Sequence, residues 1–162
     1  MKKVTTIPGQ KNHMTTSFNG EMIFCRINLS QTNYNLADNW NYINNPDLDV
    51  LNLIYRKYCQ HKKFDSVMPI FDSQYTDTAT DIIGYSHNNN LVAFSLIKRY
   101  NLENAESVQF AWDYANPELK LGIRSLENEC ALYKSLGFKF LYLGLAHPYK
   151  SQINGYEVLG PL

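Results

Sequence analysis

The chain has 162 residues, of which 44% are hydrophobic and 19% are charged, and its formal net charge at pH 7 is zero. This length suits a single domain with one sizeable hydrophobic core. The balanced charge gives no global electrostatic attraction to nucleic acid or to a membrane surface, although it is compatible with a local basic patch.

The cysteines and histidines predict neither disulfides nor a metal site. Cys25, Cys59 and Cys130 are odd in number and widely spaced, which fits no disulfide framework and no CxxC pair. The four histidines lack the HxxxH or HxH spacing that is typical of metal-ligand clusters. We therefore expect a protein without a bound metal, in a reducing, cytoplasmic compartment.

The first residues, 1–20, are polar and lack the apolar stretch of a secretory signal, so we predict a disordered leader there. The remaining residues, 21–162, are predicted to form one domain. No run of about 18 or more apolar residues occurs, so we expect no transmembrane helix and no membrane partner.

The first predicted elements are a short strand at 22–29 and a helix that begins at 46–49. A proline suits the first turn of that helix, and two aspartates complement its positive N-terminal dipole. Apolar residues then recur on one helical face, at Leu48, Leu51, Tyr55 and Tyr58. The cations at 56–57 and 61–63 are expected to compensate the negative end of the helix, and a phosphate-contacting patch is the alternative.

The next segments predict a strand at 66–71, a polar loop at 72–81 and a β-hairpin. The hairpin strands, 82–86 and 91–97, flank the triplet Asn88-Asn89-Asn90. Asparagine tolerates the positive φ that a tight hairpin turn needs, so this triplet predicts the turn itself.

A strand at 107–114 is followed by a helix whose predicted start is 116–118. The buried stripe of this helix is predicted to consist of Ile123, Leu126, Cys130 and Tyr133. Arg124 and Glu127 have the i, i+3 spacing of a surface ion pair. Gly137 stands where a left-handed helix cap is expected.

The segment 140–145 is apolar on both faces apart from Tyr142, which predicts a central strand, and 156–159 is predicted to be a last strand. The order of elements predicts an α/β (α+β) protein: a mixed sheet flanked by helices, with a right-handed crossover between the strands at 107–114 and 139–145. We expect the ligand to bind where those two strands end.

Residues 82–161 carry several motifs at a characteristic spacing. They are Leu91-Val92-Ala93, Trp112-Asp113 followed by Pro117, Leu121-Gly122 fifteen residues before Gly137, Leu141-Tyr142-Leu143-Gly144, and Pro161. In these motifs the segment resembles the C-terminal domain of aminoacyl-tRNA–protein transferases, the arginyl and leucyl enzymes. It departs from that family in having Gly155 and Tyr156 where the family has a Tyr-Lys pair, and in keeping only Lys120 of its arginine-rich run.

The resemblance implies a GNAT-like acyl-CoA N-acyltransferase fold and an enzyme that transfers an acyl or aminoacyl group to an amine without a metal. The implied donor is acetyl-CoA, another acyl-CoA or aminoacyl-tRNA, and the implied acceptor is a protein N-terminus or a small amine. An acetyl-CoA-dependent N-acetyltransferase is one alternative, with Gly122 as the single glycine kept in the phosphate-binding loop. A non-catalytic binding module with the same fold is the other.

Amine attack on an activated carbonyl needs N–H donors for the oxyanion, a proton acceptor and a proton donor. In the GNAT-like fold this chemistry lies where two central strands splay apart, here around 112–114. The candidate catalytic residues are Asp113, to bind the amine or accept its proton, Tyr149 as general acid and His147 as base. Their structural alternatives are a helix-capping aspartate, a surface tyrosine and a loop histidine. The candidate donor-binding residues are Trp112, Tyr114, Lys120, Gly122, Arg124 and Lys150.

Overall fold

The structure, a computed structural model, describes residues 22–64 and 69–160. Its centre is a seven-stranded sheet with the strand order β2-β3-β4-β5-β6-β1-β7. The strands are β1 (Phe24–Asn28), β2 (Trp40–Tyr42), β3 (Thr80–His87), β4 (Asn90–Arg99), β5 (Asn104–Trp112), β6 (Phe140–Leu145) and β7 (Tyr156–Leu159). Neighbouring strands are antiparallel except β5 and β6, which are parallel and joined by a helical crossover. The leader predicted at residues 1–20 lies outside the described residues.

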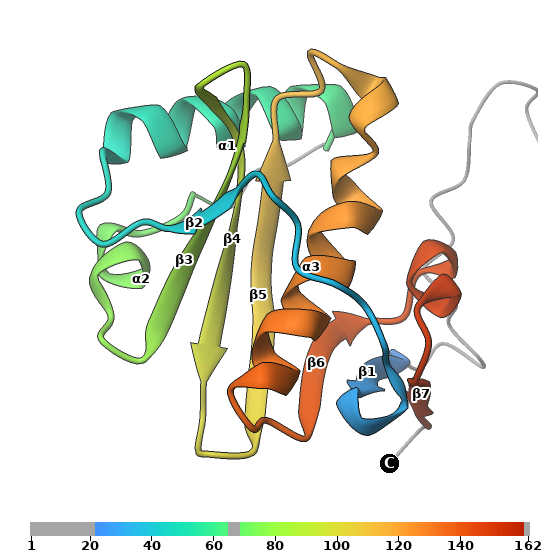
Figure 1. Cartoon of the computed structure of the whole chain (residues 1–162). Coiled ribbons are helices and arrows are strands. Elements are labelled where there is room, and N and C mark those ends of the chain that lie inside the picture. Colours follow the sequence, from blue (N-terminus) through green and yellow to red (C-terminus); the bar gives the residue numbers. More distant parts are fainter. Residues whose placement is uncertain (1–21, 65–68, 161–162) are drawn as a thin grey trace, which may run out of the picture.

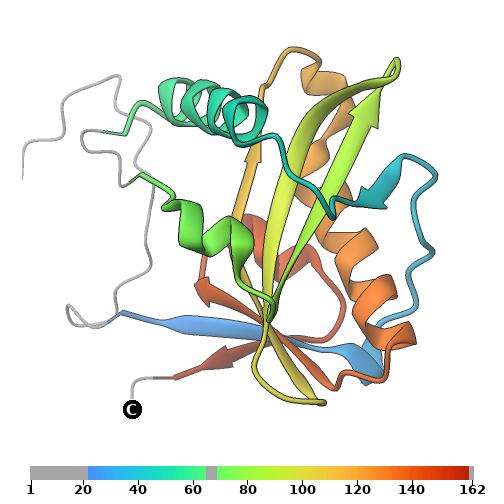
Figure 2. The same cartoon turned by 90° about the vertical axis from the view of Figure 1, so that its left-hand side faces the viewer.

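Helices cover both faces of this sheet, so the protein has three layers (Figures 1 and 2). The α-helices are α1 (Leu48–Lys62), α2 (Asp72–Thr76) and α3 (Leu121–Ser135), and the short 3-10 helices are η1 (Leu29–Gln31), η2 (Pro117–Leu119) and η3 (Pro148–Gln152). Helix α3 lies on one face of the sheet, whereas α1 and α2 lie on the other. Within the described residues, no helix has the length and apolarity that a membrane-spanning segment requires.

Alternation of side chains along the strands divides the core into two clusters. On the face of α3, Tyr85 and Trp112 pack with Cys130 and Tyr133 of the helix. On the opposite face, a second set of buried side chains from the strands and from α1 and α2 packs together: Leu51, Ile54, Tyr75, Ile82, Phe94, Leu96 and Ala111. Neighbouring residues of β5 therefore contribute to different layers, as Ala111 and Trp112 do.

Local signals in the sequence place several of these elements correctly. Asp47 caps α1, because its Oδ1 accepts the backbone N–H groups of Asp49 and Val50 at 3.1 and 3.3 Å. The hairpin turn between β3 and β4 consists of Asn88 and Asn89, with φ of 50° and 63°. Gly137 has a φ of 91° just after α3, which confirms the predicted left-handed position.

Three predictions of local structure are wrong in kind or in extent. The segment predicted as a loop at 72–81 contains α2, which begins after the Phe71 N–H donates to the Gln74 side chain at 2.9 Å and which buries Tyr75. Residues 69–71 form no strand, while 65–68 lie outside the described residues. The crossover helix begins at Leu121 rather than at 116–118, because the chain first forms η2 and then takes a left-handed conformation at Lys120, with φ 49°.

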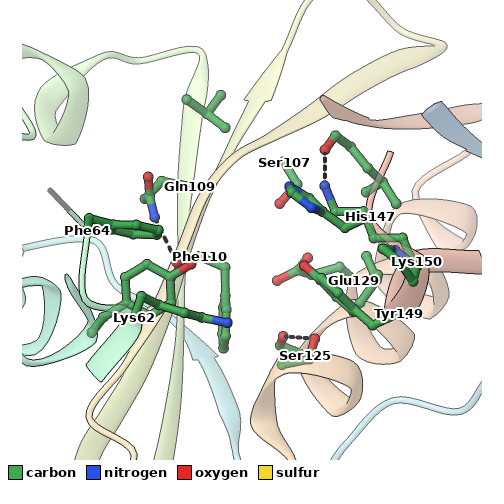
Figure 3. A pocket seen from close by; sticks show the side chains of 16 residues that line it. Lys62, Phe64, Ser107, Gln109, Phe110, Ser125, Glu129, His147, Tyr149 and Lys150 are labelled. Atoms are coloured by element: carbon green, nitrogen blue, oxygen red, sulfur yellow. Dashed lines mark hydrogen bonds between the residues drawn. The ribbon is translucent and has the colours of Figure 1, made fainter. Parts of the chain in front are cut away.

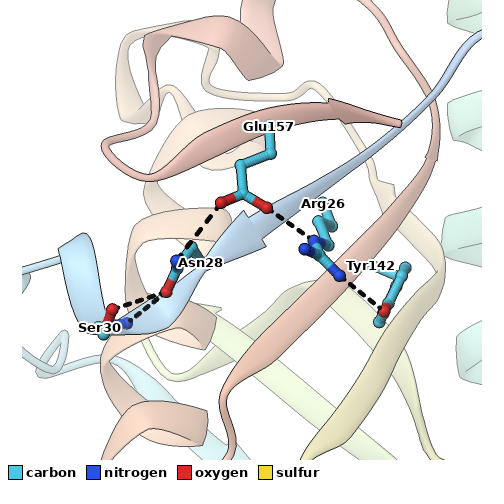
Figure 4. Close-up of polar contacts among 5 residues, drawn as sticks. All are labelled: Arg26, Asn28, Ser30, Tyr142 and Glu157. Atoms are coloured by element: carbon cyan, nitrogen blue, oxygen red, sulfur yellow. Dashed lines mark hydrogen bonds and ion pairs between the residues drawn. The ribbon is translucent and has the colours of Figure 1, made fainter. Parts of the chain in front are cut away.

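The first strand is second from one edge of the sheet, where it pairs with both β6 and β7. The Arg26 guanidinium fixes this position: its Nε donates to Glu157 Oε2 at 2.7 Å and its Nη1 to the Tyr142 hydroxyl at 3.1 Å (Figure 4). The same guanidinium lies 3.8 Å from the centre of the Phe140 ring. One side chain therefore joins three strands at the end of the sheet that carries β6.

We expect Gly155→Ala to detach β7 from β1. Gly155 has a φ of 79°, and a Cβ at this position would lie 2.4 Å from the backbone oxygen of Asn28. The strained φ and the clash together should lower the free energy of unfolding by about 2–4 kcal/mol, measured by urea denaturation. Gly160→Ala is the matched control, because no atom lies within 4 Å of an added Cβ there. Equal losses in the two variants would contradict this explanation.

Candidate functional site

The candidate site lies where the parallel strands β5 and β6 separate. Their pairing consists of three residue pairs, Asn104–Phe140, Ala105–Leu141 and Glu106–Tyr142, and then ends. Each strand also has an irregularity in its pairing with its other neighbour, at Val108 in β5 and at Leu143 in β6. Such bulges bend a strand locally, and both of these lie just beyond the last β5–β6 pair.

The separation leaves a cavity of about 730 Å³ between the two strands (Figure 3). The residues that line it come from α1 and the segment after it, from β5, from α3, and from β6 and η3: Tyr58, Lys62, Phe64, Ser107, Val108, Gln109, Phe110, Gly122, Ser125, Leu126, Glu129, Leu143, His147, Pro148, Tyr149 and Lys150. Because α1 and α3 cover opposite faces of the sheet, these residues lie on both sides of it. In Figure 3, Lys62 and Phe64 lie on one side of the cavity and Glu129, Tyr149 and Lys150 on the other.

Two backbone N–H groups of β5 point toward this gap. The Asp113 N–H donates to Val92 O of β4 at 3.0 Å, which fixes the alternation of the strand. Ala111 then faces β4 with its N–H, whereas Phe110 and Trp112 direct theirs away from β4, toward the side on which β6 has diverged. The outward carbonyl of Phe110 accepts the Gln109 side-chain amide at 2.7 Å. The N–H groups of Phe110 and Trp112 thus point toward the gap between β5 and β6.

Lys150 satisfies backbone carbonyls of β6 beyond the point of divergence. Its Nζ donates to Leu143 O and Leu145 O, both at 2.7 Å. Burial lowers the pKa of this ammonium, and the nearby Cys25 thiol opposes that shift. Lys150 thus lines the cavity, but its charge is directed at the strand.

Glu129 brings a carboxyl group to the same cavity from α3. It is 2% exposed, and its Oε1 accepts the Ser95 hydroxyl and, at 3.2 Å, the Tyr85 hydroxyl. Tyr85 in turn accepts the side-chain amide of Asn128 at 3.3 Å. Burial raises the pKa of Glu129 to about 7, although the two hydroxyl hydrogen bonds oppose this. The site therefore holds a carboxyl group that titrates near neutral pH.

Of the candidate catalytic residues, His147 and Tyr149 line the cavity and Asp113 does not. Burial raises the pKa of Tyr149 to about 12, so its hydroxyl is protonated at neutral pH. The Asp113 side chain lies in the turn after β5, where its Oδ1 accepts the N–H of Ala115 at 2.9 Å.

Of the candidate donor-binding residues, Gly122 and Lys150 line the cavity. Lys120 and Arg124 are exposed at the start of α3, and Arg124 forms its predicted ion pair with Glu127 at 3.4 Å. The first turn of α3 contains no acidic residue, and no side chain caps it. The Ile123 N–H donates to Lys120 O at 3.1 Å, so the N–H groups of Leu121 and Gly122 are the ones that an anion could reach.

Trp112 and Tyr114 lie in an aromatic cluster that reaches the cavity through Tyr58. Trp112 is buried, and its ring centre is 4.1 Å from that of Tyr114. Tyr114 stacks on His61 at 3.7 Å and on Tyr58 at 6.1 Å, and Lys62 Nζ lies 5.8 Å from the Tyr114 ring centre. The C-terminal turn of α1 is thereby fixed to the turn after β5.

No sequence motif indicated Glu129 or the N–H groups of Phe110 and Trp112 as part of the site. Glu129 could have been noticed from its position in the buried stripe of α3, between Leu126 and Cys130. A carboxyl group is rarely fully buried in a protein unless it is paired. No sequence pattern predicts the orientation of the two N–H groups, because it depends on where β5 and β6 stop pairing. Among residues 22–64 and 69–160, no group of three His, Cys, Asp or Glu side chains is arranged to hold a metal ion.

Comparison with known proteins relates the fold to solved structures. No protein-family model and no curated protein matches the sequence. The C-terminal domain assigned to a lysylphosphatidylglycerol synthetase of Agrobacterium fabrum is similar over 78% of this chain and 46% of its own, with a TM-score of 0.58 and 12% identity. L-PGS from Bacillus licheniformis gives the same TM-score and identity over 78% and 47%. A protein of Novosphingobium aromaticivorans assigned to the GNAT acetyltransferases is similar over 83% and 58%, with a TM-score of 0.56 and 15% identity.

The chain thus has the GNAT-like acyltransferase fold, a mixed seven-stranded sheet flanked by helices. It spans about half the length of the solved structures that it matches. At these identities the similarity concerns the fold, and the activity has to be argued from the site.

We expect Lys150→Met to destabilise the protein by about 2 kcal/mol, because two buried carbonyls lose their charged donor while the side-chain length is kept. Urea denaturation measures this change. Lys139→Met is the control, since the Lys139–Glu103 ion pair is exposed and should contribute less than about 1 kcal/mol. A larger loss in Lys139→Met than in Lys150→Met would refute the role of Lys150.

The raised pKa of Glu129 predicts a pH-dependent stability. Between pH 4.5 and about 7 the folded protein keeps a proton on Glu129 that the unfolded chain releases, so the free energy of unfolding should fall as the pH rises through this range. Glu129→Gln removes this dependence. The free energy of unfolding of the variant, relative to that of the wild type, should therefore increase by about 2–3 kcal/mol from pH 5 to pH 8. Urea denaturation at both pH values measures the difference, and Glu127→Gln, on the exposed side of α3, should show no such gain.

Proposed function

We propose that this protein transfers an acyl or aminoacyl group from an activated donor to an amine, in the cavity between β5 and β6. The observation that carries the proposal is the early end of the β5–β6 pairing. It turns the N–H of Phe110, which lines the cavity, and the N–H of Trp112 toward the side from which β6 has diverged. Backbone N–H groups held in this way can bind the carbonyl oxygen of the donor and the oxyanion that forms on attack.

The two sides of the cavity suit a reaction between two substrates. A donor that lies along α3 and an amine that approaches from the side of α1 would meet at the N–H groups of β5. Holding both reactants at one point converts a bimolecular step into an effectively unimolecular one. The cavity is large enough for a thioester or an aminoacyl ester together with a small amine.

The anionic part of the donor would lie at the N-terminus of α3. Gly122 lines the cavity in the first turn, and the N–H groups of this turn have no side-chain cap. A helix of 15 residues presents partial positive charge at this end, which favours phosphate. Lys120 and Arg124 flank the same turn and would add charge, and Trp112 and Tyr114 would support the donor from β5.

Tyr149 is our proposed proton donor to the leaving group. Its hydroxyl is protonated at neutral pH and lies in the cavity, as a general acid requires. His147, which precedes η3 and lines the same space, is the second residue that we propose for proton transfer. Asp113 would contribute by holding the turn that follows the N–H groups.

The names of the similar structures support two classes of donor. One neighbour is assigned to the GNAT acetyltransferases, and another to a lysylphosphatidylglycerol synthetase. An acyl-CoA and an aminoacyl-tRNA both present an activated carbonyl beside an anionic group, so the arrangement at α3 suits either. The proposed acceptor is an amine, on a protein N-terminus or on a small molecule.

We expect acetyl-CoA to raise the melting temperature of the protein in a saturable way. A ligand at about a hundred times its dissociation constant adds roughly 2.7 kcal/mol to the free energy of unfolding, which is about 5–10 °C for a chain of this size. Gly122→Trp should abolish the shift by filling the cavity. Gly122→Ala should keep it, because no atom lies within 4 Å of an added Cβ.

Aminoacyl-tRNA is the second ligand in this experiment. A shift with aminoacyl-tRNA alone, weakened by salt, would identify the donor as an aminoacyl ester. The absence of a shift with both donors, in a protein that melts cooperatively, would contradict the proposed transferase and leave a non-catalytic binding module.

A further inference from the structure

The proposed transfer requires a group that takes a proton from the attacking amine, and the cavity offers few. Of the described residues that line it, Glu129 is the one carboxylate and His147 the one imidazole. Lys150 already donates to two carbonyls, and Tyr149 is protonated at neutral pH. Asp113 lies outside the cavity, where it accepts the Ala115 N–H.

The hydrogen bonds of Glu129 place its carboxyl group beside the proposed reaction centre. Ser95, which donates to Glu129 Oε1, is the direct cross-strand partner of Phe110. This is a pair without mutual hydrogen bonds, in which the two Cα atoms are about 4.5 Å apart and the side chains share one face. The carboxyl group therefore lies close to the residue whose N–H would hold the donor carbonyl.

The two oxygens of this carboxyl group have different surroundings. Both hydrogen bonds, from Ser95 and Tyr85, fall on Oε1, and the described residues give none to Oε2. The carboxyl group is thus held by one oxygen, with the other available to a ligand in the cavity. Two neutral hydroxyl donors fix its position without neutralising its charge.

From this arrangement we propose that Glu129 binds the ammonium form of the acceptor and takes a proton from the amine during transfer. The proton-transfer role of Glu129 rests on the proposed function, whereas ammonium binding does not depend on it. Glu129 first takes one proton from the bound ammonium and releases it to water, which leaves a neutral amine. The amine nitrogen then forms a C–N bond to the carbonyl carbon, and the C–S or C–O bond of the donor breaks. The N–H proton moves to Glu129, the leaving thiolate or alkoxide takes the Tyr149 proton, and proton exchange with water restores both residues.

The titratable and charged groups around Glu129 come from several elements. They are Tyr85 from β3, Tyr149 from η3, Cys130 and Tyr133 from α3 itself, and His147, Lys150 and Lys62 elsewhere on the cavity wall. No cation contributes to the pKa shift of Glu129, which burial dominates. A bound ammonium would therefore be the first positive charge to act on this carboxyl group, and it would lower its pKa.

The first experiment measures the ionisation of Glu129 directly, without turnover. In protein labelled with 13C at the Glu carboxyl carbons, one resonance should titrate near pH 7 and should be missing in Glu129→Gln. Saturating n-butylamine should move its midpoint to lower pH by at least about half a unit, while n-butanol, which lacks the positive charge, should not. An unchanged midpoint with n-butylamine would overturn ammonium binding.

The second experiment follows transfer itself, with the donor that stabilises the wild-type protein. The kcat/KM profile should rise with an apparent pKa near 7, and Glu129→Gln should lose this limb together with about 10²–10⁴-fold in rate. Its KM for the donor should stay unchanged. Glu127→Gln, on the exposed side of the same helix, should behave as the wild type.

The outcomes separate this inference from the proposed function. A wild-type protein that transfers acyl groups, with Glu129→Gln equally active and unchanged in pH profile, would overturn the role of Glu129 and leave the transferase intact. A wild-type protein inactive with every donor would overturn the transferase and the proton-transfer step, and the titration would then decide ammonium binding alone.

Discussion

The organisation of this protein depends on one constraint: two parallel strands in the middle of a sheet cannot separate unless their backbone groups find other partners. Beyond Glu106 and Tyr142, β5 and β6 no longer pair. An unpaired backbone group in a protein interior costs about as much as a lost hydrogen bond. Here Lys150 donates hydrogen bonds to two carbonyls of β6, and the side chain of Gln109 donates one to the carbonyl of Phe110. The carbonyls are thereby paired within the protein, whereas the outward N–H groups of β5 remain for a ligand.

The buried carboxyl group of Glu129 is a second departure from what packing alone would favour. Burial raises the pKa of this carboxyl group to about 7, so the group titrates near neutral pH. The surrounding hydroxyl and amide groups of Ser95, Tyr85 and Asn128 form a connected network that holds it in place. Perturbed groups of this kind gather at functional sites more often than elsewhere, which agrees with its position in the cavity.

Similarity to known structures shows the fold, whereas the identity of the substrate depends on the side chains of the site. Proteins assigned to different transfer reactions share this sheet at 12–15% identity. The site of this chain contains an uncapped helix N-terminus at Gly122, an aromatic cluster around Tyr114, and Glu129 hydrogen-bonded to Ser95. In the proposed reaction, specificity for donor and acceptor would come from these groups, because a shared fold carries many unrelated reactions.

The sequence by itself determined the local elements and the fold class, because capping residues, turn residues and apolar periodicity act within a few positions. It predicted a helix start at 46–49, the asparagine turn, Gly137 and the central strand 140–145. It did not predict α2, which forms as Tyr75 becomes buried in the core. It also placed the start of α3 too early, because Lys120 takes a left-handed conformation just before the helix. Only the tertiary structure decided that β1 lies between β6 and β7, that the β5–β6 pairing ends after three pairs, and that Glu129 faces the gap. These features depend on contacts between residues far apart in the chain, which no local pattern records.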